Sequence, residues 1–121
     1  MLIKEENYKV NFIDENDVFV GYDMRQCCCE DAGYFISESA NEPYSYDGNA
    51  SIDCVDGYIF DVNFFGHIES RDLDSGGQVC FRLTKGGCED LYLHLHNSHN
   101  GYYSHGFQAM VGGETWQSGV L

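Results

Sequence analysis

Basic residues are scarce in this chain of 121 residues, which has six Lys and Arg against 20 Asp and Glu. The formal net charge is −14, and residues 1–60 contribute −10 of it. Such a surface repels phosphate backbones and anionic lipid headgroups. We therefore expect no direct binding to nucleic acid or to a membrane. A basic protein surface is the natural partner.

Signals for export and for common catalytic chemistry are also missing. The N-terminal residues contain no apolar run of the export type, and no stretch approaches the ~18 apolar residues of a membrane span. This predicts a cytoplasmic protein whose six Cys are free thiols. The chain has no Cys-x-x-Cys pair, no phosphate-binding loop and no Gly-x-Ser-x-Gly elbow. We therefore expect a protein that is not an enzyme.

Helical periodicity is absent as well, because no stretch of ten or more residues repeats its apolar positions every 3.6 residues. Residues 39–53 hold the only Pro together with several Ser and Asn, and are predicted to be a long exposed loop. Elsewhere apolar residues alternate with polar ones, which is typical of strands. The predicted strands are residues 7–13, 18–24, 33–37, 57–68, 78–84, 91–96 and 102–111.

The size and these strands predict one domain over residues 1–121. The fold class is mainly β, with α+β as the alternative. We expect a mostly antiparallel twisted sheet or a two-layer β arrangement, with at most one or two short helices. The alternation also assigns side chains to faces. It places Tyr8 with Phe12, and Phe60 with Val62 and Phe64, on core-facing sides.

Two histidines of the 91–96 strand are candidate metal ligands. His94 and His96 leave the same face of the strand, opposite Leu91, Leu93 and Leu95. Two imidazoles at this spacing can bind zinc or another divalent metal if a third ligand, such as His67 or Cys88, lies near. In the alternative interpretation, both rings are simply exposed to solvent and no cofactor is bound.

Acidic and aromatic residues of the first half are candidates for contact with a partner. The acids are Asp14, Glu15, Asp17, Glu30 and Asp31. Tyr44 and Tyr46 lie in the predicted loop, where exposed tyrosines could anchor a protein that the acids attract. The alternative is that these aromatics cover the end of a sheet.

Two short strings resemble a family of small phage and prophage proteins without an assigned activity. The first is Gln26-x-Cys28-Cys29-Glu30, and the second is Asn100-Gly101-Tyr102-Tyr103-Ser104. Cys27 and His99 depart from the family, in which Asp and Ser are usual. The resemblance implies a phage-encoded accessory protein in a bacterial cytoplasm. It also implies a structural role for Cys28, Cys29, Asn100, Gly101 and Tyr102, with thiols packed under a hairpin.

The leading hypothesis for function is a protein that binds and inhibits or modulates a basic host protein. For a phage protein, a nucleic-acid-handling defence complex is the natural target, which makes the chain an anti-CRISPR or similar anti-defence factor. Its acids would mimic nucleic acid in a Lys- and Arg-lined groove. One alternative is a metal-binding domain that uses His94 and His96, with or without enzymatic activity. The other is a phage structural or assembly protein.

Overall fold

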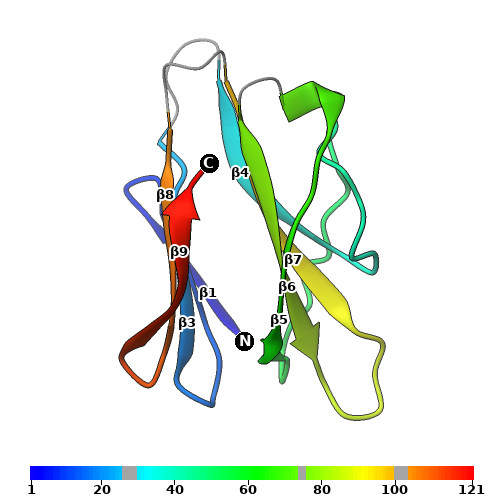
Figure 1. Ribbon diagram of the computed structural model, residues 1–121. Helices are drawn as coiled ribbons and strands as arrows, with labels where there is room; N and C mark the ends of the chain where they lie inside the picture. Colours follow the sequence, from blue (N-terminus) through cyan, green and yellow to red (C-terminus); the bar gives the residue numbers. More distant parts are fainter. Residues whose placement is uncertain (26–29, 74–75, 100–103) are drawn as a thin grey trace.

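In the part of the chain that the structure describes, nine β-strands form two antiparallel sheets that face each other (Figure 1). This computed structural model describes residues 1–25, 30–73, 76–99 and 104–121, without the side chain of Arg71. The described residues contain no α-helix and one short 3-10 helix, η1 (Arg71–Leu73). The fold class is therefore all-β in one small domain, as the alternation predicts.

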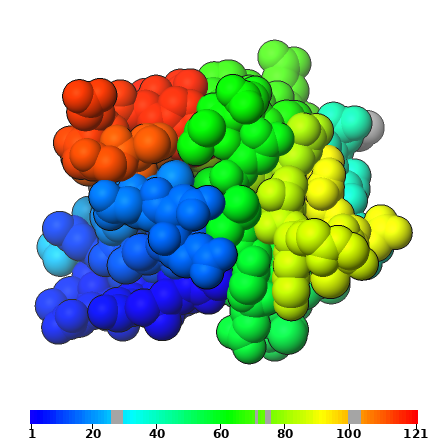
Figure 2. Space-filling model, turned by 90° about the horizontal axis from the view of Figure 1, so that it is seen from below, coloured from blue at the N-terminus to red at the C-terminus, as the bar shows by residue number. Residues whose placement is uncertain are grey.

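The five-stranded sheet has the strand order β1-β2-β3-β8-β9, and the four-stranded sheet has the order β4-β7-β6-β5. Figure 2, seen from below, shows the two sheets as the two halves of the molecule, blue and orange to red on one side and green to yellow on the other. The strands are β1 (Leu2–Glu6), β2 (Lys9–Ile13), β3 (Val18–Asp23), β4 (Asp31–Ser37), β5 (Ile59–His67), β6 (Gly77–Thr84), β7 (Leu91–Ser98), β8 (Gly106–Val111) and β9 (Glu114–Val120).

The core lies between the sheets and is built from alternate residues of the central strands. Phe12 and Val20 of the five-stranded sheet are fully buried, as are Phe81, Leu93 and Leu95 of the four-stranded sheet. Burying one such side chain stabilises a fold by roughly 1.5–3 kcal/mol. The predicted core position of Phe12 is thus confirmed.

Tyr8 does not belong to this core, and its predicted position is wrong. Its side chain is 69% exposed, because Asn7 and Tyr8 form the tight turn between β1 and β2. Both residues have positive φ, 52° and 67°. Two residues of positive φ match the twist of a two-residue hairpin. The strand that precedes the turn, β1, was not predicted.

The predicted common face of Phe60, Val62 and Phe64 is also wrong. Phe60 pairs with Leu83 in register, but the pairing of β5 with β6 shifts before Phe65. A shift by one residue moves following side chains to the opposite face of a sheet. Phe60 is consequently buried, while Val62 is 39% exposed. Phe65 replaces Phe64 in the core and lies against Phe81, with ring centroids 5.2 Å apart.

Candidate functional site

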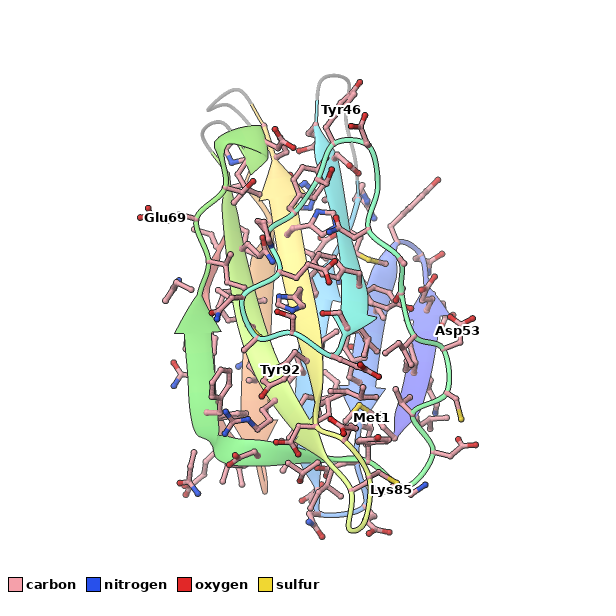
Figure 3. The ribbon with its side chains drawn as sticks, turned by 90° about the vertical axis from the view of Figure 1, so that its right-hand side faces the viewer. Met1, Tyr46, Asp53, Glu69, Lys85 and Tyr92 are labelled. Carbon is pink, nitrogen blue, oxygen red and sulfur yellow. The ribbon has the colours of Figure 1, made fainter. Side chains whose placement is uncertain are left out.

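Residues 38–58, which we call the acidic strap, first cross the outer face of the four-stranded sheet and then run beside the edge of β4 (Figure 3). Several hydrogen bonds hold it there. The amide of Tyr44 donates to the side-chain oxygen of Gln78 at 2.8 Å, and the amide of Ile52 donates to the carbonyl of Ile36 at 2.8 Å. Nε2 of His94 lies 2.9 Å from the carbonyl oxygen of Ser39. The predicted long exposed loop is therefore a covering layer of the sheet.

His94 lies beneath the strap and is fully buried. Gln78 has a fixed orientation, because its oxygen accepts from Tyr44 and its amide nitrogen donates to the carbonyl of Glu42. That nitrogen also lies 3.1 Å from Nδ1 of His94, which must therefore accept. Nε2 then carries the proton and donates to Ser39. Burial lowers the pKa of His94, so that the neutral ring is the form that fits this cluster.

His96 is buried next to His94, between two aromatic rings. Tyr44 lies 4.5 Å from its ring centroid and Phe35 lies 6.0 Å from it. Burial lowers the pKa of His96, and the nearby charge of Asp31 acts in the opposite direction. The prediction that one face of β7 meets solvent at His94 and His96 is thus wrong, because the strap covers that face.

The surroundings of His94 and His96 do not provide a set of metal ligands. Both ring nitrogens of His94 have protein partners within 3.1 Å. Within residues 1–25, 30–73, 76–99 and 104–121, no three His, Cys, Asp or Glu side chains lie close enough to hold a metal ion. The predicted third ligands His67 and Cys88 therefore do not join the histidine pair.

Tyr44 and Tyr46 have opposite environments. Tyr44, predicted to be exposed, is 3% exposed, and its hydroxyl donates to the carboxylate of Asp31. Burial and this hydrogen bond raise the pKa of Tyr44. Tyr46 is 80% exposed and lies at the top of Figure 3, where the strap turns back. Tyr44 thus anchors the strap, while Tyr46 is available to a partner.

The free carboxylates of the strap are those of Glu38, Asp47, Asp53 and Asp56, all of them exposed. None makes a hydrogen bond or an ion pair with another described residue. Residues 26–70, which include the strap, contain nine Asp and Glu and no Lys or Arg. These four acids were not among the predicted partner contacts. The absence of any base over 45 residues was the sequence signal that could have pointed to them.

Three of the predicted partner-binding acids serve the fold itself. Asp14 is 7% exposed and accepts from the amides of Asn16, Val18 and Phe60 at 2.9, 3.0 and 2.8 Å. The side chain of Glu30 is fully buried, and its carboxylate lies 3.0 Å from Nε2 of His105. The carboxylate of Asp31 accepts from Tyr44.

The two remaining predicted acids, Glu15 and Asp17, are exposed in the turn between β2 and β3. That turn belongs to the five-stranded sheet, whereas the strap covers the four-stranded sheet. The structure therefore does not bring the predicted acids together into one surface.

The cysteines of the described residues show no sign of catalytic activation. Cys54 and Cys88 are free and exposed, and Cys80 is free and buried. Burial raises the pKa of the Cys80 thiol to about 12, which leaves it protonated and unreactive near neutral pH. The residues assigned a structural role by resemblance, Cys28, Cys29, Asn100, Gly101 and Tyr102, lie outside the described residues.

An open cleft of about 970 Å³ separates β5 from β9. The apolar side chains of Phe65, Phe107 and Leu121 line this cleft together with polar residues that include Glu69 and Ser118. In Figure 1 this side of the molecule is the one where β9 faces β5 and β6 near the C-terminus. The strap lies on another side, so the molecule has two separate candidate surfaces.

Comparison of the chain with family models, with curated proteins and with solved structures finds no match. The resemblance to small phage proteins therefore stays a prediction. Within the described residues, no helix has the length and the apolar character that crossing a membrane would require.

Proposed function

We propose that this chain is a non-enzymatic binding protein whose acidic strap engages a basic surface of another protein. The observation that supports this most directly is the set of four unpaired, exposed carboxylates on one segment, Glu38, Asp47, Asp53 and Asp56. Tyr46 adds an exposed aromatic ring to the same segment. Acids that attract a partner and an aromatic residue that anchors it are the usual components of such an interface.

The chemistry of the strap suits a partner that normally holds nucleic acid. A groove lined with Lys and Arg attracts phosphate backbones, and exposed carboxylates compete for the same cations. In the phage setting that the sequence resemblance implies, the partner is a host defence complex that handles nucleic acid. The chain then acts as an anti-CRISPR or related anti-defence inhibitor by occupying that groove.

The anchors beneath the strap favour this role. Tyr44, Gln78 and His94 fix the backbone of the strap before any partner arrives. Binding by a segment that is already ordered loses less conformational entropy than binding by a flexible acidic tail. The acids are therefore held in a fixed pattern, as phosphates are on a nucleic acid.

The test uses two variants with the same change in net charge. The strap variant carries Glu38→Gln, Asp47→Asn, Asp53→Asn and Asp56→Asn. The control variant carries Glu6→Gln, Glu15→Gln, Asp17→Asn and Glu114→Gln, which are exposed acids of the five-stranded sheet and its turns. Bacterial proteins captured by the immobilised wild-type chain at low salt are identified, and their affinities for all three proteins are measured at two salt concentrations.

We expect the affinity of the captured partner to fall by at least roughly tenfold between 50 and 500 mM salt. We expect a similar loss for the strap variant at low salt and less than about a threefold change for the control variant. An affinity that does not depend on salt would contradict the proposal. Equal losses in both variants would show that net charge, and not the strap, attracts the partner.

A further inference from the structure

The two sheets have four edge strands, β1, β9, β4 and β5, and three of them are protected against pairing with another chain. β1 carries the charged residues Lys4 and Glu6. β5 has an irregular register between residues 60 and 65. β4 is covered by the strap, whose Ile52 amide bonds to the carbonyl of Ile36. Charges, bulges and covering loops are the means by which proteins block edge pairing.

From Gln117 to Val120, beyond the register shift that follows Thr115, β9 carries no charged residue and presents free backbone groups. His105 and Leu121 exchange both backbone hydrogen bonds, at 2.9 and 2.8 Å. In an antiparallel pair, bonded and non-bonded residue pairs alternate. Gly119, which faces residue 107, is therefore bonded to β8, whereas the amides and carbonyls of Ser118 and Val120 point to the open edge. Neither of these two residues makes another backbone bond within the described chain.

The free edge of β9 borders the cleft between β9 and β5. Phe65 and Phe107 contribute aromatic rings to this cleft, and the side chain of Val120 is 70% exposed beside it. A strand that pairs with β9 would alternate its side chains between the cleft and the solvent. Backbone bonds to Ser118 and Val120 would hold such a strand, and every second side chain could pack against the rings of Phe65 and Phe107.

We propose that the edge of β9 is a docking site for an extended basic segment of another protein, which adds as a sixth strand to the five-stranded sheet. The described lining of the cleft includes the carboxylate of Glu69 and no Lys or Arg. A second copy of the chain would bring another 14 negative charges to this edge, so charge disfavours self-pairing. The proposal goes beyond the function of the strap, since the strap takes no part in it.

The experiment uses three synthetic nine-residue peptides as probes. KVTVKVTVK alternates apolar and polar residues and is basic. VVKKTKTVV has the same composition without the alternation, and EVTVEVTVE keeps the alternation with acidic residues. Binding to the full chain is followed by fluorescence anisotropy, and amide hydrogen exchange is measured at single residues. We expect KVTVKVTVK to bind at least roughly tenfold more tightly than either of the other peptides.

Amide exchange at single residues tests the location of the site, which the affinity alone does not. We expect bound KVTVKVTVK to slow amide exchange at Ser118 and Val120 by roughly tenfold or more, while Gly119, already bonded to β8, changes little. Ser118→Pro removes an outward amide that the sheet itself does not use, and should weaken binding roughly tenfold. Ser118→Ala keeps the amide and should bind as the wild type does. The strap variant should also bind this peptide normally.

Several results would overturn the proposal. One is the absence of added protection at Ser118 and Val120 in the wild type, which is decisive even if Ser118→Pro fails to fold. Another is equal binding of the acidic peptide. A third is dimerisation of the chain that Ser118→Pro abolishes, because the edge would then belong to a second copy. Failure of the strap variant to bind its captured partner is a different result and concerns only the proposed function.

Discussion

At the scale of single residues, three buried polar side chains, those of Asp14, Gln78 and His94, form hydrogen bonds with the backbone of turns and loops. Asp14 secures the turn between β2 and β3 and, through Phe60, the start of β5. Gln78 and His94 secure the strap. A buried polar group is tolerated only when its hydrogen bonds are satisfied, so each of these residues commits a nearby loop to one conformation.

Replacement of Asp14 by Ala should be strongly destabilising. It would leave the amide of Phe60 buried without a partner and would remove two further bonds to a charged acceptor. We expect the free energy of unfolding to fall by about 2–4 kcal/mol, measured by urea denaturation. Glu15→Ala, at the exposed neighbour, is the control and should change it by less than about 0.5 kcal/mol. Similar effects of the two substitutions would contradict the assigned role of Asp14.

Stability should depend on pH through His94. Its pKa in the fold is lowered from the ordinary value of 6.5, so the folded protein resists the proton that the unfolded chain takes up below that pH. The neutral ring therefore makes its full contribution to the free energy of unfolding above pH 6.5, and this contribution is lost as the pH falls below that value. The loss is at most about 1.4 kcal/mol per pH unit for one proton.

The measurement compares the wild type with His94→Gln between pH 8 and pH 5. The unfolding free energy of the wild type should exceed that of the variant by less and less as the pH falls. Carboxylate titration affects both proteins equally, so it cancels in this difference. His67→Gln, at an exposed histidine, is the control and should leave the pH dependence unchanged. An advantage that is constant over this range would exclude a buried neutral His94.

At the scale of elements, the connections determine which faces of the sheets are covered. The four-stranded sheet is buried on both sides only because the strap returns across it, and this is why β7 can carry buried His94 and His96 opposite its leucines. The connection between η1 and β6 is equally close, since Gly76 lies directly against the backbone of β7 at Asn97.

Gly76→Ala should be among the most damaging single substitutions in the chain. A Cβ atom at this position would lie 1.6 Å from the carbonyl oxygen of Asn97, which no side-chain movement can relieve. We expect a loss of more than about 3 kcal/mol in thermal or urea unfolding. Gly86→Ala, in the turn between β6 and β7, meets no atom within 4 Å and should be neutral or slightly stabilising. Tolerance of Ala at position 76 would show that this close approach is not maintained in solution.

The strands that could be predicted from the sequence are those in which apolar residues clearly alternate with polar ones. In both β6 and β7, every second side chain points into the core and is buried. Apolar residues occupy these positions, so the sequences of the two strands alternate. β1 and β9 were missed because they are edge strands with mostly exposed side chains. A strand that contributes little to the core carries little periodic signal, although its backbone pairing is as regular as that of its neighbours.

At the scale of the whole molecule, the charge of −14 acts against the folded state. Two ion pairs of Arg82, with Asp61 at 3.3 Å and Asp90 at 3.9 Å, offset only a small part of the excess. Carboxylates held close together repel one another more in the compact fold than in the unfolded chain. Salt screens this repulsion over distances beyond about 10 Å at 0.1 M.

The melting temperature should therefore rise when the NaCl concentration is raised from 20 to 500 mM, as followed by circular dichroism. The strap variant, which has four fewer charges, should melt at or above the temperature of the wild type at low salt and should respond less to salt. This result would also show that its loss of partner binding does not come from unfolding. A melting temperature that falls with added salt would indicate that attractive ion pairs dominate instead.

The sequence by itself determined the class of this protein. Its alternation specifies most of the strands and part of the core, since both depend on residue types and their order alone. The tertiary structure decided which polar residues are buried and which are free. The fold buries the side chains of Asp14, Glu30 and Tyr44. It leaves those of Glu38, Asp47, Asp53 and Asp56 exposed. The reason is that burial of a loop residue depends on which distant strand the loop crosses, and no local pattern encodes that contact.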